Sequence, residues 1–199
     1  MIARPLVMAI AVAAFSLYLS GCAEEPWYGK EITGLMPELE FELTDESGRT
    51  VTESVFRGQP VAIYFGFTHC PDICPTTLAR LTAATRQLPG DLGKDLQLAF
   101  VSVDPDRDDP PQLARYTGAF SDRMLGLTGD QRQLRSLTRR YRVTYGYEKP
   151  DENGDYEVSH SSAVFVFDAR GEPRLMLLDS LSVRQMAHDL EMLLAGSSA

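Results

Sequence analysis

Two cysteines, Cys70 and Cys74, are the residues whose type and spacing point most directly to chemistry. They form a CxxxC pattern, and each is followed by a proline. Side chains at positions i and i+4 project to the same side of a helix or a helix-like turn. Two thiolates that face one point suit a soft metal ion such as Cu(I), or Zn(II), and the same pair can also form a disulfide. The pattern therefore indicates a metal-binding or redox site.

A purely structural disulfide, or a pair of buried free thiols, is the alternative. A bridge across so short a loop would stabilise the fold very little. The pair also lies where an expected strand, residues 61–67, meets an expected helix, and ligands often bind at the carboxyl ends of such strands. The start of that helix is predicted to lower the pKa of the Cys74 thiol. Thioredoxin-type exchange favours CxxC and a peroxidatic cysteine favours Thr-x-x-Cys, so both patterns differ from this one.

The chain has three histidines that could supply a further ligand. We interpret His188 as a solvated residue of the terminal helix. His69 adjoins Cys70, but neighbours in regular structure point in different directions, so we expect it at most to tune the thiol. His160 precedes a buried strand, and in a thioredoxin-like layout that segment packs against the cysteine pair. His160 is therefore the candidate that would complete a Cys2His site, in which thiolates favour Cu(I) and imidazole accepts Cu(II).

The hydrophobic pattern predicts strands that alternate with helices. Buried strands are expected at 61–67, 98–103 and 163–167, and a further strand at 175–178. Helices are expected at 76–88, 110–120, 134–141 and 183–193, the first of them with Pro75 at its first position. A hairpin arm at 39–44 precedes them, and Asn153-Gly154 marks the turn of a hairpin insertion within 145–158. This order predicts an α/β fold with a central mixed sheet flanked by helices.

The N-terminus has the pattern of a targeting segment. Arg4 precedes an apolar run, residues 6–19, which is shorter than the roughly 20 residues of a membrane-spanning helix. The run ends in Leu19-Ser20-Gly21-Cys22, which resembles a bacterial lipobox. We expect a lipoprotein signal peptide at 1–21, a lipid on Cys22, a tether at 22–37 and one domain at 38–199. The alternatives are an uncleaved anchor or a plain secretory signal, and each of the three places the domain outside the cytoplasm.

Composition and charge narrow the classes of function. The hydrophobic fraction of 44% is typical of a globular protein with a packed core. The formal net charge of −9 is the wrong sign for a nucleic-acid-binding protein, so no nucleic-acid partner is expected.

The sequence resembles the Sco/SenC family, which helps assemble the copper centres of cytochrome c oxidase. The resemblance covers residues 35–194 and rests on three motifs: Tyr64-Phe65-Gly66-Phe67-Thr68-His69-Cys70-Pro71-Asp72-Ile73-Cys74-Pro75, Ser102-Val103-Asp104-Pro105-Asp106-Arg107-Asp108 and His160-Ser161-Ser162. It implies a thioredoxin-like fold and copper bound by the two cysteines and the histidine. Many members of the family have a transmembrane anchor, whereas a lipid is expected here.

The resemblance also suggests a part for Asp104, which follows an expected strand. It would orient the metal ligands or meet a partner protein. The alternative is a turn acid, because Asp-Pro is a common turn dipeptide.

From these features we expect a copper metallochaperone, not an enzyme, on the periplasmic side of a bacterial cell membrane. It would pass copper to the copper-bearing subunit of cytochrome c oxidase and exchange it with other periplasmic copper chaperones. A thiol–disulfide oxidoreductase that keeps the recipient's cysteines reduced is one alternative, since the same pair could cycle as a disulfide. A copper or redox sensor is another.

Overall fold

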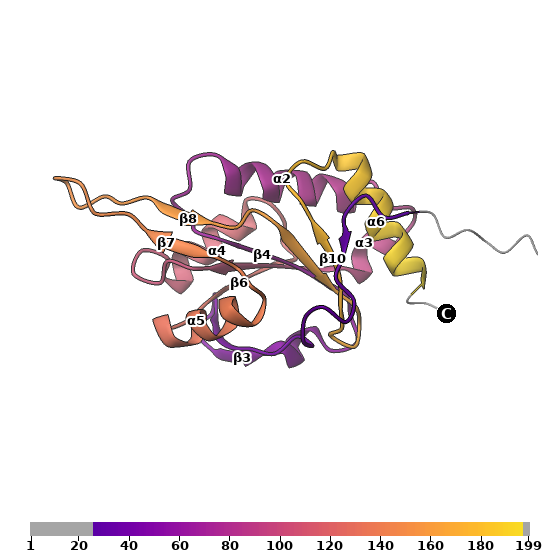
Figure 1. Cartoon of the computed structure of the whole chain (residues 1–199), viewed down its shortest axis with the longest axis horizontal. Helices are drawn as coiled ribbons and strands as arrows, with labels where there is room; N and C mark the ends of the chain where they lie inside the picture. Colours follow the sequence, from indigo (N-terminus) through magenta and orange to yellow (C-terminus); the bar gives the residue numbers. More distant parts are fainter. Residues whose placement is uncertain (1–25, 197–199) are drawn as a thin grey trace, which may run out of the picture.

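The structure is a computed structural model that describes residues 26–196 (Figure 1). Its strands are β1 Lys30–Glu31, β2 Glu42–Asp45, β3 Thr50–Thr52, β4 Val61–Gly66, β5 Gln97–Ser102, β6 Met124–Thr128, β7 Tyr145–Tyr147, β8 Val158–His160, β9 Val164–Phe167 and β10 Pro173–Leu177. Its helices are the 3-10 helix η1 Glu53–Phe56, α2 Ile73–Arg86, α3 Leu92–Asp95, α4 Pro110–Gly118, α5 Gln131–Arg140 and α6 Val183–Gly196.

Eight of the strands form one mixed sheet. Their order is β1-β10-β9-β4-β5-β6-β2-β3. The central strands β4, β5 and β6 are parallel, and β9, β10, β1, β2 and β3 join them in antiparallel pairs. The predicted mixed α/β sheet and the N-terminal hairpin, β2–β3, are therefore confirmed.

The centre of the sheet is buried on both faces. Every residue of β4 is buried, as expected for a parallel strand that helices cover from two sides. Figure 1 shows α2 and α6 on one side of the sheet and α5 on the other. The chain crosses over through α2 from β4 to β5 and through α4 from β5 to β6. Both pairs of strands are parallel, so the carboxyl ends of β4 and β5 lie at the same edge of the sheet.

Helix α2 begins earlier than the sequence pattern indicates. It starts at Ile73, so Pro75 is its third residue and not its first. A proline is tolerated there because the first four N–H groups of a helix have no partner within the helix. As a result, Cys74 lies within the first turn.

The predicted boundary between tether and domain, at residue 38, is too late. The Tyr28 and Gly29 N–H groups donate to the buried carboxylate of Asp189 in α6, at 3.0 and 2.6 Å. Strand β1 then pairs with β10, and Ile32 is buried in the core. These residues, predicted to be part of the tether, belong to the folded domain. The predicted signal peptide and Cys22 lie outside the described residues.

The predicted hairpin insertion is present as the two-stranded sheet β7–β8, which projects from the body (Figure 1). Its far end turns at Gly154, which has a positive φ. Within residues 26–196, no helix has the length and apolarity to span a membrane.

Candidate metal centre

The two cysteines lie at the junction between β4 and α2. After Gly66 the chain turns, and the Cys70 N–H donates to the Phe67 carbonyl at 3.3 Å. The Cys74 N–H donates to the Cys70 sulfur at 3.4 Å, which holds the two side chains on the same side of the turn. Both thiols are free and buried, and Cys74 is fully inaccessible. The predicted convergence of the i, i+4 pair is confirmed.

His160 reaches the pair from the hairpin insertion. It is the last residue of β8, and its Nε2 lies 3.1 Å from the Cys74 Sγ. The ligand atoms of Cys70, Cys74 and His160 all lie within 4.8 Å of one another. We call these three residues the Cys2His cluster. Among residues 26–196, no other group of three His, Cys, Asp or Glu side chains is placed so that it could hold a metal ion.

The His160 ring is fixed in one orientation. Its Nδ1–H donates to the Ser161 carbonyl at 3.0 Å, and because a carbonyl can only accept, Nδ1 must carry the hydrogen. The rings of Tyr64 and Phe67 contact it edge-on, at centroid distances of 5.9 and 5.8 Å. The lone pair of Nε2 therefore points toward the cysteines, as metal binding requires.

Burial controls the protonation of the cluster. It raises the pKa of the Cys74 thiol far above the ordinary value. The Phe67 backbone opposes this shift, and the neighbouring Cys70 adds weaker contributions that raise the pKa further. The prediction that the start of the helix lowers this pKa was wrong, because loss of water outweighs the helix dipole. Burial also lowers the pKa of His160, which keeps the imidazole neutral at pH 7.

The donor set fits a copper ion. Two sulfurs and one imidazole nitrogen converge on one point, and this combination suits Cu(I) through the thiolates and Cu(II) through the imidazole. Three protein ligands also leave room for an exchanging ligand. A metal would displace the thiol hydrogen that faces Nε2.

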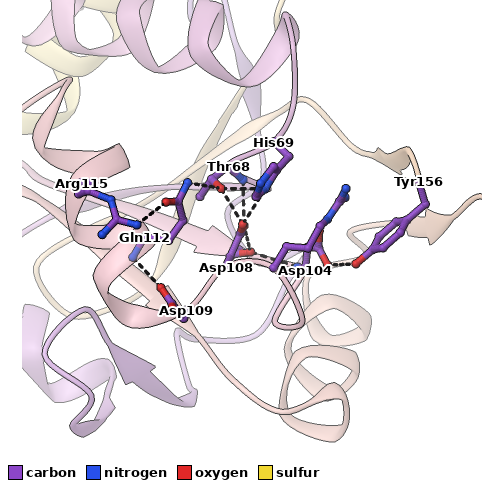
Figure 2. A network of polar contacts seen from close by, with 10 residues as sticks. Thr68, His69, Asp104, Asp108, Asp109, Gln112, Arg115 and Tyr156 are labelled. Carbon is purple, nitrogen blue, oxygen red and sulfur yellow. Dashed lines mark hydrogen bonds and ion pairs between the residues drawn. The ribbon is translucent and has the colours of Figure 1, made fainter. Parts of the chain in front are cut away.

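Asp108 organises the approach to the cluster, and sequence analysis did not single it out. Its buried carboxylate accepts hydrogen bonds from the Thr68 N–H (2.8 Å), the Thr68 hydroxyl (2.6 Å) and the Ser102 hydroxyl (2.5 Å). Figure 2 shows this carboxylate between Thr68 and His69. Gln112 of α4 donates to the Thr68 hydroxyl oxygen at 3.1 Å. Asp108 therefore ties the segment that leads to Cys70 to the end of β5.

Asp104 has a different set of contacts. Its buried carboxylate accepts from the Tyr156 hydroxyl and from Arg107, both at 2.6 Å (Figure 2). The Arg107 guanidinium stacks 3.7 Å from the Tyr156 ring centre and 5.7 Å from that of Phe67, which itself contacts His160. Within the described part of the chain, no hydrogen bond or ion pair joins Asp104 to the Cys2His cluster. Its contacts tie the hairpin insertion to the body, and a role in orienting ligands stays a prediction.

The other two histidines lie outside the cluster. His69 is exposed, and its Nδ1 faces Asp108 at 3.4 Å and the Thr68 hydroxyl at 3.2 Å. His188 is not the solvated residue predicted from the sequence. Its ring contacts Tyr28 edge-on at 5.0 Å, and its Nδ1 lies 3.1 Å from Asp189.

Comparison with known proteins gives the family. The family model described as SCO1/SenC matches residues 34–195. The chain belongs to the SCO1/SenC family. The human protein named "Protein SCO2 homolog, mitochondrial" is 45% identical over 133 residues, which are 66% of this chain and 50% of that protein. The chain thus spans about half the length of this curated relative. Curated relatives in this family include both mitochondrial and bacterial proteins.

Solved structures of the SCO1/SenC family share the fold. Bradyrhizobium japonicum ScoI with copper bound has a TM-score of 0.70 and 32% identity, and covers 78% of this chain and 98% of that one. Arabidopsis thaliana ScoI with copper bound has a TM-score of 0.73 and 31% identity, and covers 80% of this chain and 98% of that one. The thioredoxin-like architecture implied by the sequence is confirmed.

Proposed function

We propose that this protein is a copper metallochaperone that helps assemble the copper centre of cytochrome c oxidase. The observation that carries the proposal is the Cys2His cluster, whose three ligand atoms lie within 4.8 Å of one another. Membership of the SCO1/SenC family and likeness to copper-bound family structures support it. Cys70, Cys74 and His160 hold the copper in this proposal, as Cu(I) through both thiolates and as Cu(II) with the imidazole.

The geometry suits a carrier more than a storage site. His160 comes from the projecting β7–β8 hairpin, and its side chain is only partly buried. A recipient's thiol could therefore approach the copper from that side and replace one ligand at a time. The recipient in this proposal is the copper-bearing subunit of the oxidase, and other periplasmic copper chaperones are further partners.

The proposed location follows from the N-terminal sequence. Signal peptidase would remove residues 1–21, a lipid on Cys22 would anchor the chain, and the domain would face the periplasm of a bacterial cell. The tether is shorter than the sequence suggested, because residues from Tyr28 onward pack on the domain. The copper site would therefore stay close to the membrane that holds the oxidase subunit.

A second candidate function is thiol–disulfide exchange with the recipient's cysteines. The observation that favours it is that both cysteines are free and that the Cys74 N–H already approaches the Cys70 sulfur at 3.4 Å. In this exchange the reduced pair would become a Cys70–Cys74 disulfide while the recipient's disulfide becomes two thiols. His160 has no necessary part in that reaction, so it separates the two candidates.

A transfer experiment tests the proposal. The chain, with Cys22→Ser to remove the third thiol, is loaded with Cu(I) and mixed with the reduced soluble domain of a copper-bearing oxidase subunit. We expect copper to move to the recipient, measured after chromatographic separation, and His160→Ala to abolish tight loading and hence transfer. Retained copper would contradict the chaperone function. If the copper-free chain instead reduced an oxidised recipient, and His160→Ala did so equally well, the second candidate would replace the first.

A further inference from the structure

The face of β4 that lies behind Cys74 carries two residues without an assigned role, Tyr64 and Gly66. They are two positions apart in a strand, so they share one face of the sheet, and Cys74 of α2 packs against that face. Tyr64 is completely buried. Both residues lie against the sulfur of Cys74.

Gly66 provides space that no other residue could provide. A Cβ on Gly66 would lie 2.7 Å from the Cys74 Sγ, 3.0 Å from a ring carbon of Phe100 and 3.2 Å from one of Tyr64. A contact of 2.7 Å is closer than real Cβ atoms come to another heavy atom, so the sulfur would have to move. Gly66 does not have a positive φ, so space, not backbone conformation, explains the glycine.

Tyr64 contacts two of the three ligand candidates. Its hydroxyl donates to the Cys74 Sγ at 3.8 Å, and its ring meets the His160 ring edge-on at 5.9 Å. A thiolate bound to copper still has lone pairs that accept hydrogen bonds, and hydrogen bonds to metal-bound sulfur tune the metal site. One face of β4 therefore controls both the position of the Cys74 sulfur, through Gly66, and its charge, through the Tyr64 hydroxyl.

We propose that Tyr64 and Gly66 are positioning residues of the copper site: Gly66 admits the Cys74 sulfur to its binding position, and the Tyr64 hydroxyl donates a hydrogen bond to that sulfur when copper is bound. This inference rests on the proposed function, because it concerns copper held by the Cys2His cluster.

Tyr64→Phe tests the hydrogen bond. Each variant is made in the full chain with Cys22→Ser, and Tyr141→Phe is the matched control, because that buried hydroxyl bonds to Glu38 and Glu40 and has no contact with the cluster. We expect Tyr64→Phe to bind one copper, with a shifted sulfur-to-Cu(II) charge-transfer band and a Cu(I) affinity about tenfold lower in chelator competition. Tyr141→Phe should lower only stability. A Tyr64→Phe spectrum and affinity equal to wild type would overturn the role of Tyr64.

Gly66→Ala tests the space. The matched control is Gly129→Ala, whose Cβ would also be crowded, at 2.8 Å from the end of the Leu43 side chain and 2.9 Å from the end of the Gln133 side chain, but not by the cluster. In the reduced, metal-free chain we expect Gly66→Ala to push the Cys74 sulfur outward, so that iodoacetamide alkylates Cys74 faster, as mapped by mass spectrometry. We also expect a loss of more than about tenfold in Cu(I) affinity. Gly129→Ala should change neither quantity.

The outcomes separate this inference from the proposed function. Wild-type protein that fails to bind copper tightly would contradict the proposed function itself. Wild-type protein that binds copper, together with Gly66→Ala that matches it in alkylation and affinity, would overturn the role of Gly66 alone. If Gly66→Ala does not fold, Tyr64→Phe, which keeps the same shape, decides the inference.

Discussion

At the scale of single residues, burial sets the chemistry of the Cys2His cluster. Cys74 and His160 are 86 positions apart in sequence, yet their sulfur and nitrogen lie 3.1 Å apart. Nδ1 of the imidazole already carries a hydrogen held by Ser161, so the hydrogen between Sγ and Nε2 belongs to the thiol. That hydrogen occupies the place that copper would take.

Copper affinity should therefore depend on pH. Burial raises the pKa of Cys74, so the thiol is protonated at neutral pH and copper must displace its proton. Burial lowers the pKa of His160, so the imidazole adds no further competing proton near pH 7. We expect the Cu(I) affinity to rise about tenfold per pH unit between about pH 6.5 and 8 through Cys74 alone, measured by chelator competition. Cys74→Ser should remove this component, and an affinity that does not change with pH would contradict the protonated thiol.

At the scale of elements, the site depends on the contacts that fix the position of the segment between β4 and α2, which carries Cys70. Residues 67–72 have no regular structure, so tertiary contacts must fix them. Asp108 supplies several of these contacts through Thr68, and the Asp104–Tyr156 contact holds the hairpin that carries His160. The Ser102–Asp108 motif thus supports both halves of the cluster from a single loop.

Asp108→Ala should weaken both the fold and the site. The substitution leaves the Thr68 N–H and the buried Ser102 hydroxyl without their acceptor, and we expect a loss of about 3 kcal/mol in the free energy of unfolding, measured by urea denaturation of the metal-free chain. Copper affinity should also fall, because the segment before Cys70 is released.

The neighbouring Asp109 supplies the control for that experiment. It caps α4 by accepting from the Gln112 N–H at 2.8 Å and has no contact with the β4–α2 junction. Asp109→Ala should cost about 1 kcal/mol and leave copper affinity unchanged. Equal losses of copper affinity from the two substitutions would contradict a specific role of Asp108 in holding the segment before Cys70.

At the scale of the whole molecule, strongly apolar segments were the predictable part. The apolar runs at β4, β5 and β9 indicated buried strands, because a continuous apolar stretch has no polar face to turn toward water and is stable only in the core. Strand β6 was missed because Gly126 interrupts its apolar pattern. A Cβ on Gly126 would lie 3.0 Å from the Cβ of Leu113 in α4, so the glycine allows that helix to pack closely on the strand. Strand β1 was missed because its two residues are exposed and only its backbone pairs with β10.

The site was predictable for its ligand candidates but not for their surroundings. The CxxxC spacing predicted that the Cys70 and Cys74 side chains face the same point, and the family resemblance indicated His160 as the third ligand. Burial of Cys74 reversed the predicted direction of its pKa, because the depth of a residue depends on packing that spacing alone does not reveal. Asp108 and Tyr64 both lie in the motifs quoted above, but a motif does not show what a side chain touches. The contact of Asp108 joins residues 40 positions apart, and the contact of the Tyr64 hydroxyl with Cys74 depends on how β4 packs against α2.

The most direct test of the account is a copper titration of the whole chain with Cys22→Ser, beside His160→Ala and His69→Ala. His69 is adjacent to Cys70 in sequence but faces Asp108, whereas His160 lies 3.1 Å from Cys74. We predict one tightly bound copper per chain in wild type and in His69→Ala, and a loss of at least tenfold in affinity in His160→Ala. Copper binding that survives His160→Ala unchanged, or that is lost in His69→Ala instead, would contradict the Cys2His copper site.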